Sequence, residues 1–108
     1  MAQVIVEFGR VGSGGNFTAG NTGAPVMVGV GITSEEVTTS GTSAATTATS
    51  ATGDFVSIYN ADASQVVWGR IGDSPTAAVE QDFSVAPGER REFGPLASGL
   101  AVALIDDS

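Results

Sequence analysis

The side chains of this chain that could do chemistry are few in kind. There are 12 Asp and Glu residues and 4 basic residues, all of them arginines, with no His and no Cys. The chain therefore lacks the usual general base, the commonest transition-metal ligand, a thiol nucleophile and a lysine amine. The adjacent acids Glu35–Glu36 and Asp106–Asp107 point to opposite faces of an extended chain, which does not suit the paired carboxylates of a glycosidase. These features predict a protein that is not an enzyme.

Other ligand sites have little support in the sequence. The glycine-rich stretch 12–15 lacks the helix that a phosphate site would need after it. Calcium binding would require Asp62 and Asp73, which lie in separate turns, to converge with further oxygen ligands. We therefore expect no metal and no cofactor. Trp68 and Tyr59 keep carbohydrate binding open, because lectin-like domains stack sugars on exposed aromatic rings.

The acidic balance limits the partners. A net charge of −8 would repel nucleic acid and anionic membranes, so neither is expected to bind. The first eight residues have no basic segment, and Glu7 interrupts their apolar run, which argues against a signal peptide. No apolar run approaches the roughly 18 residues that a membrane helix needs. The sequence thus predicts synthesis in the cytoplasm.

The whole chain, 1–108, is expected to form one all-β domain. Glycine makes up 15 of the 108 residues, and short β-branched runs alternate with turn residues. This pattern predicts a single β-sandwich or small barrel of seven to eight short antiparallel strands. We expect strands at 4–8, 26–32, 54–60, 65–71, 77–85, 90–93 and 100–105, with 54–71 forming a hairpin and 86–89 a type II turn. The expected core includes Val28, Val30, Val56, Ile58, Val102 and Leu104.

Two segments stand apart from the strands. Residues 12–24 form a Gly-rich loop in which Phe17 is the one large apolar residue. Residues 38–53 are rich in Thr, Ser and Ala, and two interpretations stay open for them. The segment either lies extended along a sheet edge or a neighbouring subunit, or it is a flexible linker between two half-sheets.

Several residues are candidates for an interface. Glycines inside the 26–32 strand indicate a close backbone approach, within the chain or between subunits. Arginine is enriched at interfaces, although an internal salt bridge with acids such as Glu89 or Glu92 is the plainer interpretation for the C-terminal arginines. The candidate interface residues are Phe17, Met27, Gly29, Gly31, Trp68 and Arg70.

Five segments between residues 37 and 105 form a pattern of strand and turn residues: Val-Thr-Thr-Ser-Gly-Thr-Ser-Ala (37–44), Phe-Val-Ser-Ile-Tyr-Asn (55–60), Val-Trp-Gly-Arg-Ile-Gly (67–72), Val-Ala-Pro-Gly-Glu (85–89) and Leu-Ala-Val-Ala-Leu-Ile (100–105). In this pattern, residues 37–105 resemble a group of small tailed-phage virion proteins with a β-sandwich fold. The resemblance implies a capsid decoration, or cement, subunit located in the virion. Its implied partners are its own copies, as a homotrimer, and the major capsid protein or other virion proteins. A tail or head–tail connector component and, from another class, a carbohydrate-binding β-domain are the alternatives.

Overall fold

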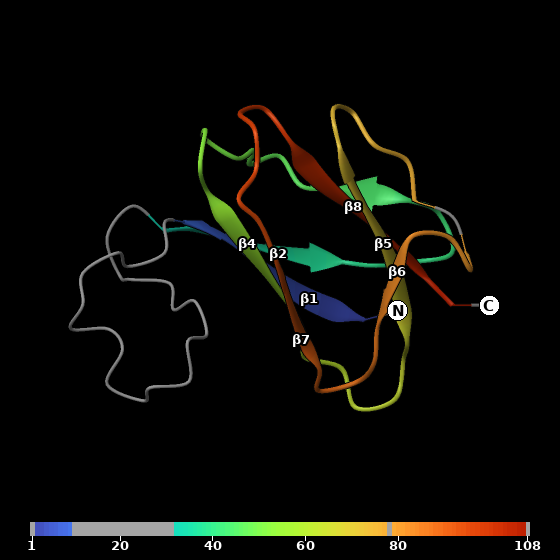
Figure 1. Cartoon of the computed structure of the whole chain (residues 1–108). Helices are drawn as coiled ribbons and strands as arrows, with labels where there is room; N and C mark the ends of the chain where they lie inside the picture. The colour runs from blue at the N-terminus through green and yellow to red at the C-terminus, as the bar shows by residue number, and fades with distance from the viewer. Residues whose placement is uncertain (1, 10–31, 78, 108) are drawn as a thin grey trace, which may run out of the picture.

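Short β-branched runs between turns form strands throughout the part of the chain that the structure describes. The computed structural model describes residues 2–9, 32–77 and 79–107. Their strands make two antiparallel sheets of four strands each, packed face to face, so the predicted all-β sandwich is confirmed (Figure 1). No helix long and apolar enough to cross a membrane occurs in these residues. The first sheet has the order β2 (Thr33–Thr38), β1 (Gln3–Gly9), β4 (Phe55–Asn60) and β7 (Arg90–Phe93); the second has β3 (Ala44–Ala45), β8 (Ala101–Asp106), β5 (Val67–Gly72) and β6 (Phe83–Val85).

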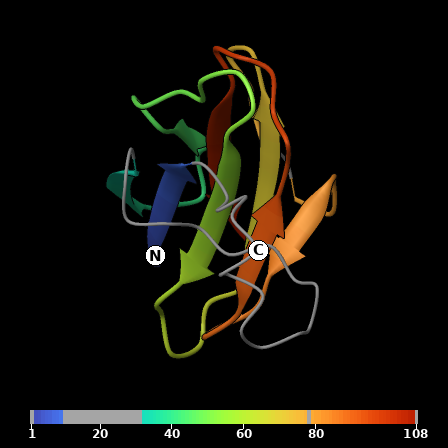
Figure 2. The same ribbon diagram turned by 60° about the vertical axis from the view of Figure 1, so that its left-hand side comes forward.

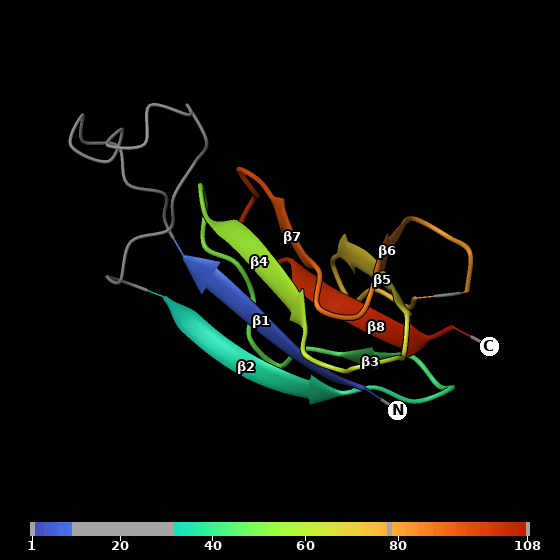
Figure 3. The same ribbon diagram turned by 90° about the horizontal axis from the view of Figure 1, so that it is seen from below.

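The chain alternates between the sheets at most of its connections. Among the described strands, only β1–β2 and β5–β6 are consecutive strands that pair with each other. Each remaining connection carries the chain from one sheet to the other, as the view from below shows (Figure 3). This order is that of an eight-strand jelly roll, except that the strand which usually closes the roll comes first here, as β1.

Alternation along the strands builds the core between the sheets. Val4, Val6 and Phe8 of β1 are 0–1% exposed, and the predicted core residues Val56, Ile58, Val102 and Leu104 are each 0% exposed, which confirms them. The predicted core residues Val28 and Val30 lie outside the described residues, as do the expected strand 26–32 and the loop 12–24.

Two phenylalanines close one side of the sandwich. β7 and β6 are edge strands of the first and second sheet (Figure 2), and the ring centroids of their Phe93 and Phe83 are 4.6 Å apart. The Phe83 ring lies directly over the backbone of Gly69, where an added Cβ would meet the ring at 2.5 Å. A side chain at position 69 would therefore displace the ring, which explains a glycine inside β5.

The predicted 54–71 hairpin is wrong, because β4 and β5 belong to different sheets. The connection between them turns at Asn60, whose side chain is 0% exposed. Its Nδ2 donates to Gln65 O at 2.7 Å and to Val85 O at 3.1 Å, and its Oδ1 accepts the N–H of Asp62 at 3.0 Å. The amide thus satisfies buried backbone groups at the corner where the chain changes sheet.

The turn at 86–89 has the expected geometry, although it too joins the two sheets. Gly88 has φ +76°, and Glu89 N donates to Ala86 O at 2.9 Å.

The expected strand 77–85 is wrong in length, since β6 covers only Phe83–Val85. Glu80 and Asp82 have φ of +65° and +64°, which interrupts extended backbone just before β6. The strand β2 was not expected, because it carries two glutamates and Glu is depleted in strands.

The segment 38–53, rich in Thr, Ser and Ala, lies beside β8 at one edge of the second sheet. Asp106 N donates to Ser40 O, Thr46 N to Val102 O, and Ser50 N to Leu100 O, at 2.8–2.9 Å. Ala44 and Ala45 pair with β8 between these contacts. Small side chains allow this close approach, so within the chain the segment completes the second sheet.

Both ends of the described chain meet at one residue of this segment. Thr39 is 0% exposed, and its Oγ1 accepts the N–H of Ala2 at 2.9 Å. The same hydroxyl donates to Oδ1 of Asp106, and Thr39 N donates to Ala2 O at 2.8 Å. The start of β1 and the end of β8 are therefore held together through Thr39.

Candidate functional site

The structure places two of the six candidate interface residues. Phe17, Met27, Gly29 and Gly31 lie outside the described residues. Trp68 and Arg70 lie on β5. Side chains alternate between the two faces of a strand, and the neighbouring positions 67 and 69 are buried, so Trp68 and Arg70 point away from the core. Both lie on the outer face of the second sheet, where they are half-buried.

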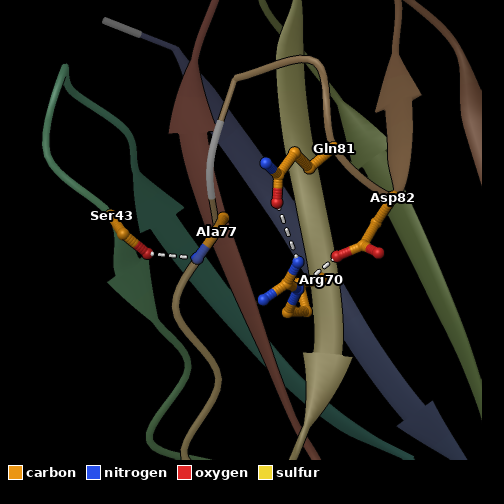
Figure 4. Close-up of polar contacts among 5 residues, drawn as sticks. All are labelled: Ser43, Arg70, Ala77, Gln81 and Asp82. Atoms are coloured by element: carbon orange, nitrogen blue, oxygen red, sulfur yellow. Dashed lines mark hydrogen bonds and ion pairs between the residues drawn. The ribbon is translucent and has the colours of Figure 1, made fainter.

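Arg70 holds the β5–β6 loop against that outer face. Its Nε forms an ion pair with Asp82, and its Nη2 donates to Gln81 Oε1 at 3.1 Å (Figure 4). On the other side, Ala77 N donates to Ser43 Oγ at 2.9 Å, just before β3. Because β8 lies between β3 and β5, a loop that reaches from Arg70 to Ser43 must cross β8.

The loop covers the outer surface of β8. Ala101 and Ala103 alternate with the core residues of β8 and so face outward, yet they are 7% and 0% exposed. Ala77 in the loop is 4% exposed. Arg70 thus forms an internal salt bridge, and its partner is Asp82 rather than Glu89 or Glu92.

The two candidate sugar-stacking rings do not share a surface. Trp68 lies on the outer face of the second sheet, where its Nε1 donates to Asp107 Oδ1 at 3.0 Å. Tyr59 alternates with the buried Ile58 of β4 and lies on the outer face of the first sheet. The sandwich separates the rings, so they cannot form one stacking platform.

Two of the acids that could have bound a ligand, Glu35 and Asp62, hold the chain's own backbone. Glu35 accepts the N–H groups of Thr47 and Ala48 at 2.9 and 2.8 Å, which ties β2 to the segment beside β8. Asp62 accepts the N–H groups of Ser64 and Gln65, and these bonds lower the pKa of its carboxyl. In the described ranges, no three acids gather in a way that could hold a metal ion.

The outer face of the first sheet carries a cluster that the sequence reasoning missed. Ile5 lies between Glu36 and Tyr59 in the strand register, and Tyr59 lies opposite Arg90. The Arg90 guanidinium carbon is 5.0 Å from the Tyr59 ring centroid, and its Nη1 contacts Ser57 Oγ and, at 3.4 Å, Glu7 Oε1. Period-2 alternation places residues of each strand outward, but only the strand order brings Ile5, Tyr59 and Arg90 into one row, with Glu7 and Ser57 in the next outward row.

Comparison with known proteins gives no relative for this chain: no family model, no curated protein and no solved structure matches it.

Proposed function

We propose that this protein is a structural subunit of a phage particle, a capsid decoration protein that stabilises the head through protein–protein contacts. The resemblance of residues 37–105 to small tailed-phage virion proteins supports this function. The two-sheet architecture is compatible with it, because jelly-roll domains occur in viral capsids. That argument is an analogy at the level of the fold, since lectins and other binding domains use the same architecture.

The observation that carries the proposal is the internal use of the polar side chains. Glu35, Asp62, Asp106 and Asp107 each accept a hydrogen bond from their own chain, and Asn60 bonds three backbone groups. These hydrogen bonds use the side chains to hold the fold together, which supports a structural role. A protein of this kind acts through its surface.

The outer face of the first sheet is the surface we assign to the capsid. The outer face of the second sheet is covered over β8 by the loop that Arg70 and Ser43 hold. The first sheet instead presents Ile5, Tyr59 and Arg90, and Tyr and Arg are enriched in protein interfaces.

Copy number in purified particles tests this function. Particles from a culture that produces the protein are banded on a density gradient, and the chain is quantified by mass spectrometry against the major capsid protein. A decoration subunit gives a fixed ratio on the order of one copy per capsid protein. A few copies per particle would assign the chain to the tail or connector, and its absence from particles would overturn the proposal.

Matched variants test the assigned face. Tyr59→Ala removes the central ring of the first sheet's outer face, whereas Thr42→Ala changes an exposed residue before β3. We expect only Tyr59→Ala to reduce co-sedimentation with undecorated capsids. Equal binding by both variants would contradict the assignment of this face. A signal on a glycan array that Tyr59→Ala abolishes would favour the carbohydrate-binding alternative.

A further inference from the structure

The two edges of the first sheet carry opposite charges in the same rows. Each row of facing residues runs from β2 through β1 and β4 to β7, as the strand registers define it. Two adjacent rows begin with glutamate on β2 and end with arginine on β7. The outward row is Glu36, Ile5, Tyr59 and Arg90, and the inward row is Glu35, Val6, Ile58 and Arg91.

The edges are also compatible in direction. Because the four strands are all antiparallel to their neighbours, β2 and β7 run in opposite directions. A second copy that continues the sheet therefore places its β2 antiparallel to β7 of the first copy. In the part of the chain that the structure describes, β2 pairs only with β1, and β7 pairs only with β4.

If the rows of the first sheet continue from β7 of one copy into β2 of the next, the register between these two strands is fixed. Glu36 then lies opposite Arg90 and Glu35 opposite Arg91, and directly opposed charges of opposite sign stabilise a strand pair. In the same register, Ser34 lies opposite Glu92, so no like charges meet.

Other registers lose this match. A shift of two residues in one direction places Glu36 opposite Glu92, and a shift of two in the other places Glu35 opposite Glu89. A shift of one residue turns the inward side chains outward. Pairing of β2 with a second β2 would bring glutamates together, and pairing of β7 with a second β7 would bring arginines together.

We infer that β2 of one copy pairs with β7 of the next, so that this protein self-associates head to tail through the edges of its first sheet. Glu36 is exposed, and the Arg90 side chain is 48% exposed, so both are accessible to a second copy. Glu35 and Arg91 are held at their edges by Ala48 N and by Ser84 O, which keeps them in position. A head-to-tail contact forms a closed ring where its rotation closes, and a trimer is one such ring.

Charge reversal at the outward pair tests this interface. The inference rests on the phage-particle role of the proposed function, whose resemblance implies self-association, and it names the surface for that association, so the experiment uses the purified protein alone. Sedimentation velocity over a range of concentrations measures the association of the wild type, E36R, R90E and the control D73R. Asp73 is exposed in the turn after β5, away from both edges, and D73R makes the same charge change as E36R.

We expect E36R and R90E each to weaken association at least about tenfold, because each places like charges opposite one another, whereas D73R associates like the wild type. In an equimolar mixture, E36R and R90E copies associate with each other, since the arginine introduced on β2 of one copy then faces the glutamate introduced on β7 of the other. Because E36R alters an exposed side chain, it carries the test even if R90E lowers stability.

Three results would overturn the interface: a wild type that stays monomeric, an equal loss in D73R, or association of E36R unchanged from the wild type. The proposed function is tested separately by the copy number in particles. A wild type that associates through another surface leaves that test unaffected.

Discussion

Removing the Asn60 amide is expected to destabilise the fold strongly. In Asn60→Ala, Gln65 O and Val85 O lose their donor, and Asp62 N loses its acceptor. Position 60 is 0% exposed, so water cannot easily take the place of the amide. A buried polar group left without its partner costs about 1–3 kcal/mol, and water partly compensates the two groups that lie nearer the surface. We therefore expect a loss of about 2–4 kcal/mol in the free energy of unfolding.

Gln65→Ala is the matched control for this experiment. Its Nε2 also donates two hydrogen bonds, to Val66 O at 2.8 Å and to Asp107 O at 3.1 Å, but Gln65 is half-exposed. Water can replace these bonds, so its loss should stay below about 1 kcal/mol. Urea unfolding followed by circular dichroism measures both variants, with equal m-values as the check that the same transition is compared. If Asn60→Ala lost no more stability than Gln65→Ala, the reasoning from burial would be refuted.

Three further predictions concern packing and protonation. Gly69→Ala should lower the free energy of unfolding by about 1–3 kcal/mol because its Cβ would meet the Phe83 ring; Gly41→Ala, with open space around it, should leave stability within about 0.5 kcal/mol in the same urea assay, and equal losses would refute the clash. Leu104→Ala should cost about 2–5 kcal/mol, and an unchanged melting temperature would contradict its place in the core. The Asp62 carboxyl should titrate by NMR below its ordinary pKa, so its stabilising contribution is full at neutral pH and is lost only as the pH falls through that lowered value; an ordinary pKa would show that its two backbone hydrogen bonds do not persist in solution.

Alternation in the sequence was enough to predict the strands that build the core. Val56 and Ile58, like Val102 and Leu104, repeat every second residue, and this period alone assigns them to one face of a strand. The same signal failed for β2, where Glu35 is turned inward yet remains satisfied by backbone N–H groups from residues 47 and 48. A carboxylate in that position has no local signature, because its partners lie 12 and 13 residues away.

Strand pairing could not be predicted in the same way. The hairpin expected at 54–71 depends on local spacing, whereas the observed corner depends on Asn60 reaching Val85, which is 25 residues away. The residues of the candidate surface could not be predicted to be neighbours for the same reason. Ile5, Tyr59 and Arg90 come from three separate parts of the sequence, and only the order of the first sheet makes them neighbours.

The position of β8 inside the second sheet has a consequence for how the chain folds during synthesis. β8 pairs with both β3 and β5, yet it is the last strand of the described chain to leave the ribosome. Until it emerges, β3 has no strand partner and β5 has only the three-residue β6 beside it. The inner face of the first sheet therefore stays uncovered during elongation, and the nascent chain is exposed to aggregation through that face until the last strand arrives.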